Sequence, residues 1–101
     1  MSHIIGYNRV SSESQSLDLG REALIKAGVP ENRIYEEKVS GKSKDNRPQL
    51  EAMLKSLRNG DECTVVNISR LARNTKDLLT IVDQIAAAGA SLNILDLGIK
   101  T

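Results

Sequence analysis

The sequence is poor in aromatic residues, because its 101 residues include two tyrosines and neither tryptophan nor phenylalanine. The hydrophobic core must therefore be built mainly from aliphatic side chains. A single cysteine excludes an internal disulfide and is compatible with the cytoplasm. No stretch approaches the roughly 20 apolar residues of a membrane-spanning helix, and the N-terminus lacks the features of a signal peptide. We therefore expect a cytoplasmic protein with no membrane partner.

Net charge is also nearly absent, since 14 lysines and arginines are offset by 13 acidic residues, leaving +1. This balance argues against a large non-specific surface for nucleic acids, but it does not exclude a local cluster of arginines. The length predicts one domain over residues 1–101. A domain of this size buries roughly 60% of its unfolded surface, which is enough for one modest core.

Short apolar runs alternate with helical patterns along the chain. We expect strands at residues 3–9, 33–38, 62–68 and 91–96. Helices are expected at residues 15–27, from Pro48 to a stop at Gly60, and from an Asn74 cap to a stop at Gly89. This alternation predicts an α/β fold with three layers, in which a mostly parallel central sheet of four to five strands has helices on both faces.

The turn after the first strand carries Arg9 and, two residues later, Ser11. Ligands of α/β sheets usually bind outside the carboxyl ends of the strands. Residues two apart on an extended strand face the same side, so a phosphate held by Arg9 would lie beside the Ser11 hydroxyl. The alternative is that Ser11 is an ordinary turn residue and that Ser12 and Gln15 form a helix capping box.

Three further arginines follow strand ends or end a polar segment. Arg47 closes the polar residues 40–46, and Arg70 and Arg73 are three residues apart after the third strand. If this last stretch is helical, both side chains project to one side, and neighbouring strand ends bring them to Arg9. Guanidinium groups bind phosphate oxygens well and remain charged, although any one of these arginines, taken alone, is equally compatible with solvated surface.

The stretch Tyr7-x-Arg9-Val10-Ser11-Ser12-x-x-Gln15 resembles the active-site signature of the serine recombinases, the resolvase/invertase family. Three other stretches match in order and spacing. Residues 39–48 resemble the flexible loop and arginine of the family, residues 69–74 its Asp-Arg-Leu-x-Arg motif, and residues 96–99 the close of its core sheet. The likeness covers essentially the whole chain.

The resemblance implies that Ser11 attacks a phosphodiester of double-stranded DNA. A 5′-phosphoserine link would form and a 3′-hydroxyl would leave, followed by strand exchange and religation. Charge on the phosphorus would be stabilised by arginines rather than by a metal or another cofactor, namely Arg9, Arg47, Arg70 and Arg73. Supporting active-site roles are implied for Tyr7, Gln15, Glu37, Ser40 and Ser69.

Two positions depart from the family pattern, which usually has aspartate in place of Ser69 and often has glutamine in place of Gly20. The family also implies a long helix, which forms dimer and tetramer interfaces, and a DNA-binding module, commonly helix-turn-helix. We therefore expect residues 1–101 to be a fragment, inactive in isolation, whose parent forms homodimers and synaptic homotetramers. Whether the parent acts as a resolvase, an invertase or an integrase is left open.

Other functions are weighed against recombination. A phosphatase-like site would use Cys63 and Arg70, but six residues separate them where the phosphatase loop has five, so Cys63 is better explained as a buried strand residue. A receiver domain should have acidic residues where Arg9 stands, and the glycine pattern of a dinucleotide-binding domain is absent. The main alternative is a recombinase-like domain that binds DNA or regulates without cutting it. His3, at the start of the first strand, is no evident general base for Ser11.

Overall fold

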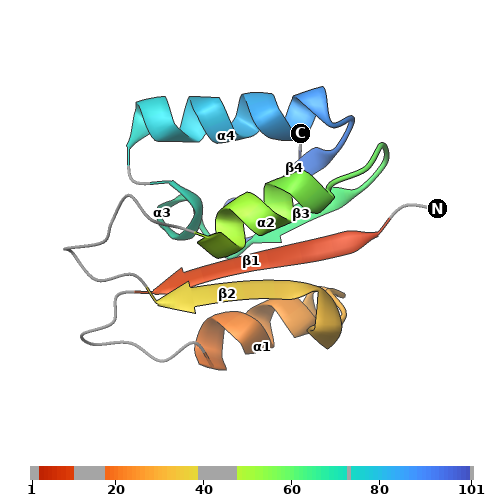
Figure 1. Cartoon of the computed structure of the whole chain (residues 1–101). Coiled ribbons are helices and arrows are strands. Elements are labelled where there is room, and N and C mark those ends of the chain that lie inside the picture. Colours follow the sequence, from red (N-terminus) through yellow and green to blue (C-terminus); the bar gives the residue numbers. More distant parts are fainter. Residues whose placement is uncertain (1–2, 11–17, 39–47, 73, 101) are drawn as a thin grey trace.

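The computed structural model describes residues 3–10, 18–38, 48–72 and 74–100 (Figure 1). Its strands are β1 (Ile4–Val10), β2 (Ile34–Lys38), β3 (Glu62–Val65), β4 (Ser91–Ile94) and β5 (Ile99–Lys100). Its helices are α1 (Asp18–Lys26), α2 (Pro48–Ser56), α3 (Ile68–Leu71) and α4 (Thr75–Ala87), with a short 3-10 helix η1 (Glu31–Arg33) before β2. In these described ranges no helix has the length and apolar character needed to cross a membrane.

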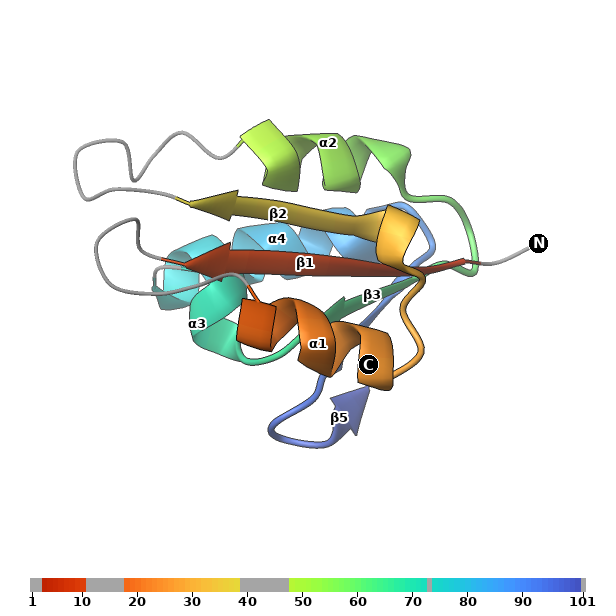
Figure 2. The same ribbon diagram turned by 90° about the horizontal axis from the view of Figure 1, so that it is seen from below.

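The strands form one sheet in the order β2-β1-β3-β4-β5. The pairs β1–β2, β1–β3 and β3–β4 are parallel, and only β5 runs antiparallel to its neighbour. Figure 1 shows α1 on one side of the sheet and α2 and α4 on the other, while Figure 2 shows β1 running between β2 and β3. The predicted three-layer fold is therefore confirmed. The direction of the strand order reverses between β1 and β3, which makes their carboxyl ends the topological switch point.

The core is aliphatic, as the composition requires. The side chains on the face covered by α2 and α4 form one buried cluster with Tyr7, to which β3 contributes the fully buried Cys63 and Val65. On the face covered by α1, the helix packs directly against β1. A Cβ added at Gly6 on β1 would lie 3.0 Å from Leu24 of α1 and 3.1 Å from Val29, so the glycine lets these two buried side chains lie directly on the strand.

Element boundaries follow local capping contacts. The Asn74 side chain accepts a hydrogen bond of 2.8 Å from the Asp77 backbone, and Gly89, with φ of +78°, follows the end of α4. Both predicted ends of this helix are confirmed. Three other predicted ends are wrong, because α2 ends at Ser56 rather than at Gly60, β3 ends at Val65 rather than at residue 68, and β4 ends at Ile94 rather than at residue 96.

Local side-chain contacts with the backbone also explain why α2 and β3 end earlier than the sequence predicts. The buried carboxylate of Asp61 accepts a hydrogen bond of 2.9 Å from the backbone N–H of Arg58, which turns the chain soon after α2. Asn67 is the N-cap of α3, so the chain leaves the strand conformation before Ile68. Short polar side chains that bond to nearby backbone compete with regular structure in this way.

Candidate active site

The carboxyl ends of β1 and β3 bring two of the predicted arginines together. Arg9 donates a hydrogen bond of 2.5 Å from Nη2 to the backbone carbonyl of Ser69, and Arg70 donates one of 3.3 Å from Nη1 to the backbone carbonyl of Arg9. Each guanidinium group therefore reaches the backbone of the other segment. Figures 1 and 2 show α3, which carries Arg70, at the end of the sheet to which β1 points. The predicted meeting of Arg9 and Arg70 at one rim is confirmed.

The short helix α3 positions Arg70. Oδ1 of its cap, Asn67, accepts hydrogen bonds from the Arg70 backbone at 3.1 Å and from the Ser69 hydroxyl at 2.7 Å. The helix ends at Leu71, and its C-cap, Ala72, is extended with φ of −135° and ψ of 152°. The helical turn therefore stops before Arg73, and the argument that i and i+3 side chains share one side does not extend to Arg73.

The side chains of Tyr7 and Glu37 are hydrogen-bonded to each other near the same end of the sheet, where Glu37 pairs with Arg9 in the strand register. The Tyr7 hydroxyl donates a hydrogen bond of 2.5 Å to Oε2 of Glu37, and both side chains are buried. Glu37 also accepts from the backbone N–H groups of Gln49 and Leu50, at 3.3 and 3.2 Å. These N–H groups belong to the first turn of α2, where a helix leaves its donors without backbone partners and favours negative charge. Glu37 thereby links β1, β2 and α2.

Ser69, which stands where the family usually has aspartate, contacts Arg9 through its backbone. Arg9 binds the backbone carbonyl of Ser69 and not its side chain. Any residue supplies that carbonyl, so this contact does not depend on the aspartate that serine recombinases usually have. The Ser69 hydroxyl instead donates to the cap of α3.

The glycine at position 20 is explained by Asn8, a residue that the sequence interpretation missed. Asn8 is fully buried on the α1 face of β1, and a Cβ at Gly20 would lie 2.3 Å from its Oδ1. A glycine within a helix costs about 1 kcal/mol relative to alanine, but alanine here would overlap Asn8. The signal was an amide side chain between Tyr7 and Arg9 in a central strand, because buried polar groups require partners.

Several predicted site residues lie outside the described residues, so their placement is not part of this structure. Their assigned roles stay predictions, and they are Ser11, Gln15, Ser40, Arg47 and Arg73. The same holds for the capping box proposed for Ser12 and for the polar residues 40–46.

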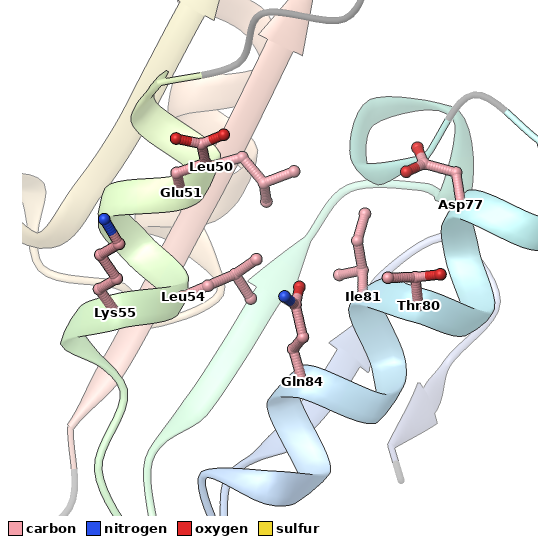
Figure 3. A pocket seen from close by; sticks show the side chains of 8 residues that line it. All are labelled: Leu50, Glu51, Leu54, Lys55, Asp77, Thr80, Ile81 and Gln84. Atoms are coloured by element: carbon pink, nitrogen blue, oxygen red, sulfur yellow. The ribbon is translucent and has the colours of Figure 1, made fainter.

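A hollow of about 440 Å³ lies between α2 and α4, on the sheet face opposite α1 (Figure 3). Its apolar lining comes from Leu50, Leu54 and Ile81, and its charged lining from Glu51, Lys55 and Asp77, with Thr80 and Gln84 completing it. Two carboxylates beside one lysine do not favour a phosphate. The paired arginines therefore remain the better candidate site for this ligand.

The lone cysteine does not support a phosphatase-like site. Cys63 is fully buried in β3 with its Sγ 3.4 Å from Sδ of Met53. Burial raises the pKa of the Cys63 thiol to about 12. The thiol is therefore protonated at neutral pH, whereas a nucleophilic cysteine must be a reachable thiolate.

Comparison with known proteins agrees with this geometry. Residues 4–101 match the family described as "Resolvase, N terminal domain". A resolvase of Clostridium perfringens is 46% identical over 89 residues, which are 88% of this chain and 47% of the relative. The transposon Tn3 resolvase of Escherichia coli is 40% identical over 98 residues, which are 97% of this chain and 52% of the relative.

A solved structure shares the fold. The N-terminal catalytic domain of TP901-1 integrase matches with a TM-score of 0.83 at 23% identity, over 99% of this chain and 82% of that domain. The chain spans about half the length of the curated relatives it matches. The family match extends over nearly every residue, from the first strand to the end of the sheet. The chain thus belongs to the family of resolvase N-terminal domains.

Proposed function

We propose that this chain is the catalytic domain of a site-specific serine recombinase that cuts and rejoins double-stranded DNA. The observation that carries the proposal is the meeting of Arg9 and Arg70 at the switch point between β1 and β3. Ser11 follows Arg9 by two residues, immediately after the end of β1. A pair of guanidinium groups beside the nucleophile is suited to hold a phosphodiester for attack.

The proposed reaction conserves phosphoester bonds. The Ser11 hydroxyl gives up its proton and its oxygen bonds to phosphorus as the bond from phosphorus to the 3′ oxygen breaks, and the 3′ oxygen takes up one proton and leaves as a hydroxyl. After strand exchange, a 3′-hydroxyl attacks the phosphoserine, restores the DNA bond and returns a proton to Ser11. Arg9 and Arg70 stabilise negative charge that develops on the phosphoryl oxygens. Arg47 and Arg73 complete the cationic site in this proposal.

Tyr7 and Glu37 act by positioning in this proposal, because Glu37 is already bonded to Tyr7 and to the first turn of α2. Arg47 directly precedes Pro48, the first residue of α2. By fixing where α2 begins, Glu37 fixes the point from which Arg47 extends. Supporting roles for Gln15, Ser40 and Ser69 are proposed on family resemblance.

The full protein is proposed to assemble as a homodimer and, with two recombination sites, as a homotetramer. Support comes from family membership and from relatives about twice as long as this chain. We propose that the additional length supplies the helix used for assembly and the module that recognises the DNA sequence. Residues 1–101 alone would then be inactive.

Covalent trapping tests the proposal. The full-length protein is incubated with a nicked suicide substrate, and the adduct is located by peptide mass spectrometry. We expect DNA linked to Ser11, loss of the adduct in Ser11→Ala with DNA binding retained, and an undiminished adduct in the control Ser12→Ala. A protein that binds the site without forming an adduct would be a DNA-binding module, and an adduct on Ser12 or Ser14 would contradict the assignment of Ser11.

A further inference from the structure

Four residues form a polar contact between α1 and the two strands that it covers, and we name them the α1 joint: Asn8, Gly20, Arg21 and Glu36. Asn8 on β1 lies opposite Glu36 on β2, and its Nδ2 donates a hydrogen bond of 3.3 Å to Oε2 of Glu36. Arg21 on α1 donates to Oε1 of the same carboxylate from Nε at 2.9 Å and from Nη2 at 2.6 Å. One carboxylate thus connects both strands to the helix.

The α1 joint is closely packed. Asn8 has no exposed surface, and the Glu36 side chain is only 15% exposed. A Cβ at Gly20 would lie 2.3 Å from Oδ1 of Asn8 and 2.6 Å from both Cγ and Nδ2. The backbone of α1 therefore rests directly on the Asn8 amide, so a shift of the helix along the strand would break contacts of Asn8 and of Arg21 together.

The α1 joint lies close to both ends of the segment that carries the proposed nucleophile. Asn8 is two residues before Val10, where β1 ends, and Gly20 is two residues after Asp18, where α1 begins. Ser11 belongs to the residues between these two ends. Whatever path those residues take, the contact between Asn8 and Gly20 sets the separation of their two anchor points.

We propose that Asn8, Glu36 and Arg21 are positioning residues for DNA cleavage, which hold α1 in the register that presents Ser11 to the phosphodiester. This inference rests on the proposed function. The Arg21 side chain is 39% exposed, whereas Asn8 is fully buried, and directional hydrogen bonds in such a partly buried site specify one arrangement more strictly than apolar packing does. Serine recombinases often carry glutamine where this chain has Gly20, and here the Asn8 amide on the strand lies against that position.

Single-turnover trapping of the full-length protein tests the proposal, with DNA affinity measured separately. We expect Asn8→Ala and Glu36→Gln to slow adduct formation by about 10- to 100-fold, the scale of loss for a reacting group misplaced by about 1 Å. The dissociation constant for DNA should remain at the wild-type value. The exchange variant Asn8→Ala/Gly20→Gln returns an amide to the joint from the helix, and it should regain most of the lost rate.

A matched control separates positioning from stability. Ile85→Val shortens a fully buried side chain on α4, on the opposite face of the sheet, and it should lower stability in urea without slowing trapping. Wild-type trapping rates in Asn8→Ala and Glu36→Gln would overturn the inference and leave the proposed function intact. If Ile85→Val slowed trapping to the same extent, the inference would also be overturned. Failure of the wild-type protein to form any adduct would instead overturn the proposed function.

Discussion

The buried hydrogen bond between Tyr7 and Glu37 should make a measurable contribution to stability. The two oxygens lie 2.5 Å apart, and Tyr7 is fully buried. Tyr7→Phe removes the hydroxyl and leaves the carboxylate with the two N–H donors of α2. Hydrogen bonds to charged groups are worth about 1.5–3 kcal/mol, so we expect the free energy of unfolding to fall by about that amount. In a domain of this size each kcal/mol shifts Tm by about 4–8 °C, which predicts a fall on the order of 10 °C.

Urea unfolding followed by far-UV circular dichroism measures this loss. The control is Tyr35→Phe, because Tyr35 is the only other tyrosine and pairs with Tyr7 in the sheet register. Tyr35 is half-buried and packs against the core, so the loss of its hydroxyl should cost much less. If Tyr7→Phe is within about 0.5 kcal/mol of wild type, the range of ordinary surface changes, or no less stable than the control, the reasoning is refuted.

A double-mutant cycle with Glu37→Gln isolates the pair itself. The glutamine keeps one carbonyl oxygen for the N–H groups of α2 but loses the charge that strengthens the bond from Tyr7. Tyr7→Phe should therefore cost clearly less in the Glu37→Gln background than in the wild type. Residues in direct contact typically couple by about 0.5–3 kcal/mol, and additive effects would show that the hydroxyl acts through packing alone.

Three further predictions concern other parts of the molecule. Arg70→Lys keeps the charge but loses the planar fork, and we expect adduct formation in the full-length protein to slow about 100-fold while DNA affinity changes far less. Burial raises the pKa of Asp61, but hydrogen bonds from the backbone N–H groups of His3 and Arg58 prevail and leave it below its usual 3.8. The stability from Asp61 is therefore present above that value and lost as pH falls below it, and Asp61→Asn should flatten the acid limb of a stability-against-pH curve. Cys63 should resist iodoacetamide at pH 8 in the folded protein and react only after unfolding, as measured by intact mass.

The fold was largely predictable because it follows from periodic burial. Alternating strand and helix patterns predicted the parallel sheet, and the glycine at position 89 and the cap at Asn74 predicted both ends of α4. The ends of α2 and β3 were missed for one physical reason. Each is decided by a side chain that bonds to nearby backbone, Asp61 and Asn67 respectively, and hydrophobic periodicity does not detect such bonds.

The site was predictable only in part, because residue types identify charges and not their partners. Parallel neighbouring strands predicted that Arg9 and Arg70 would meet. Residue types alone do not indicate that Arg9 binds a backbone carbonyl, which makes the serine at position 69 less consequential for that contact. Gly20 stands out in the sequence only as a departure from the family pattern, because its relation to Asn8 exists only once α1 lies on β1.

On β1 and on β2, consecutive residues point to opposite faces of the sheet. Each strand therefore contacts α1 on one face and α2 on the other, near the same end of the sheet. Strand alternation directs Tyr7 and Glu37 toward α2, and Asn8 and Glu36 toward α1. Apolar burial is non-directional and sets distance more than register, whereas a carboxylate bonded to three donors holds one geometry. Polar contacts of this kind occur on β1 and β2 beside Arg9 and its register partner Glu37, and they fix the position of each helix along the strands. A change in either glutamate should therefore loosen the register of a helix on the sheet as well as lower the stability of the fold.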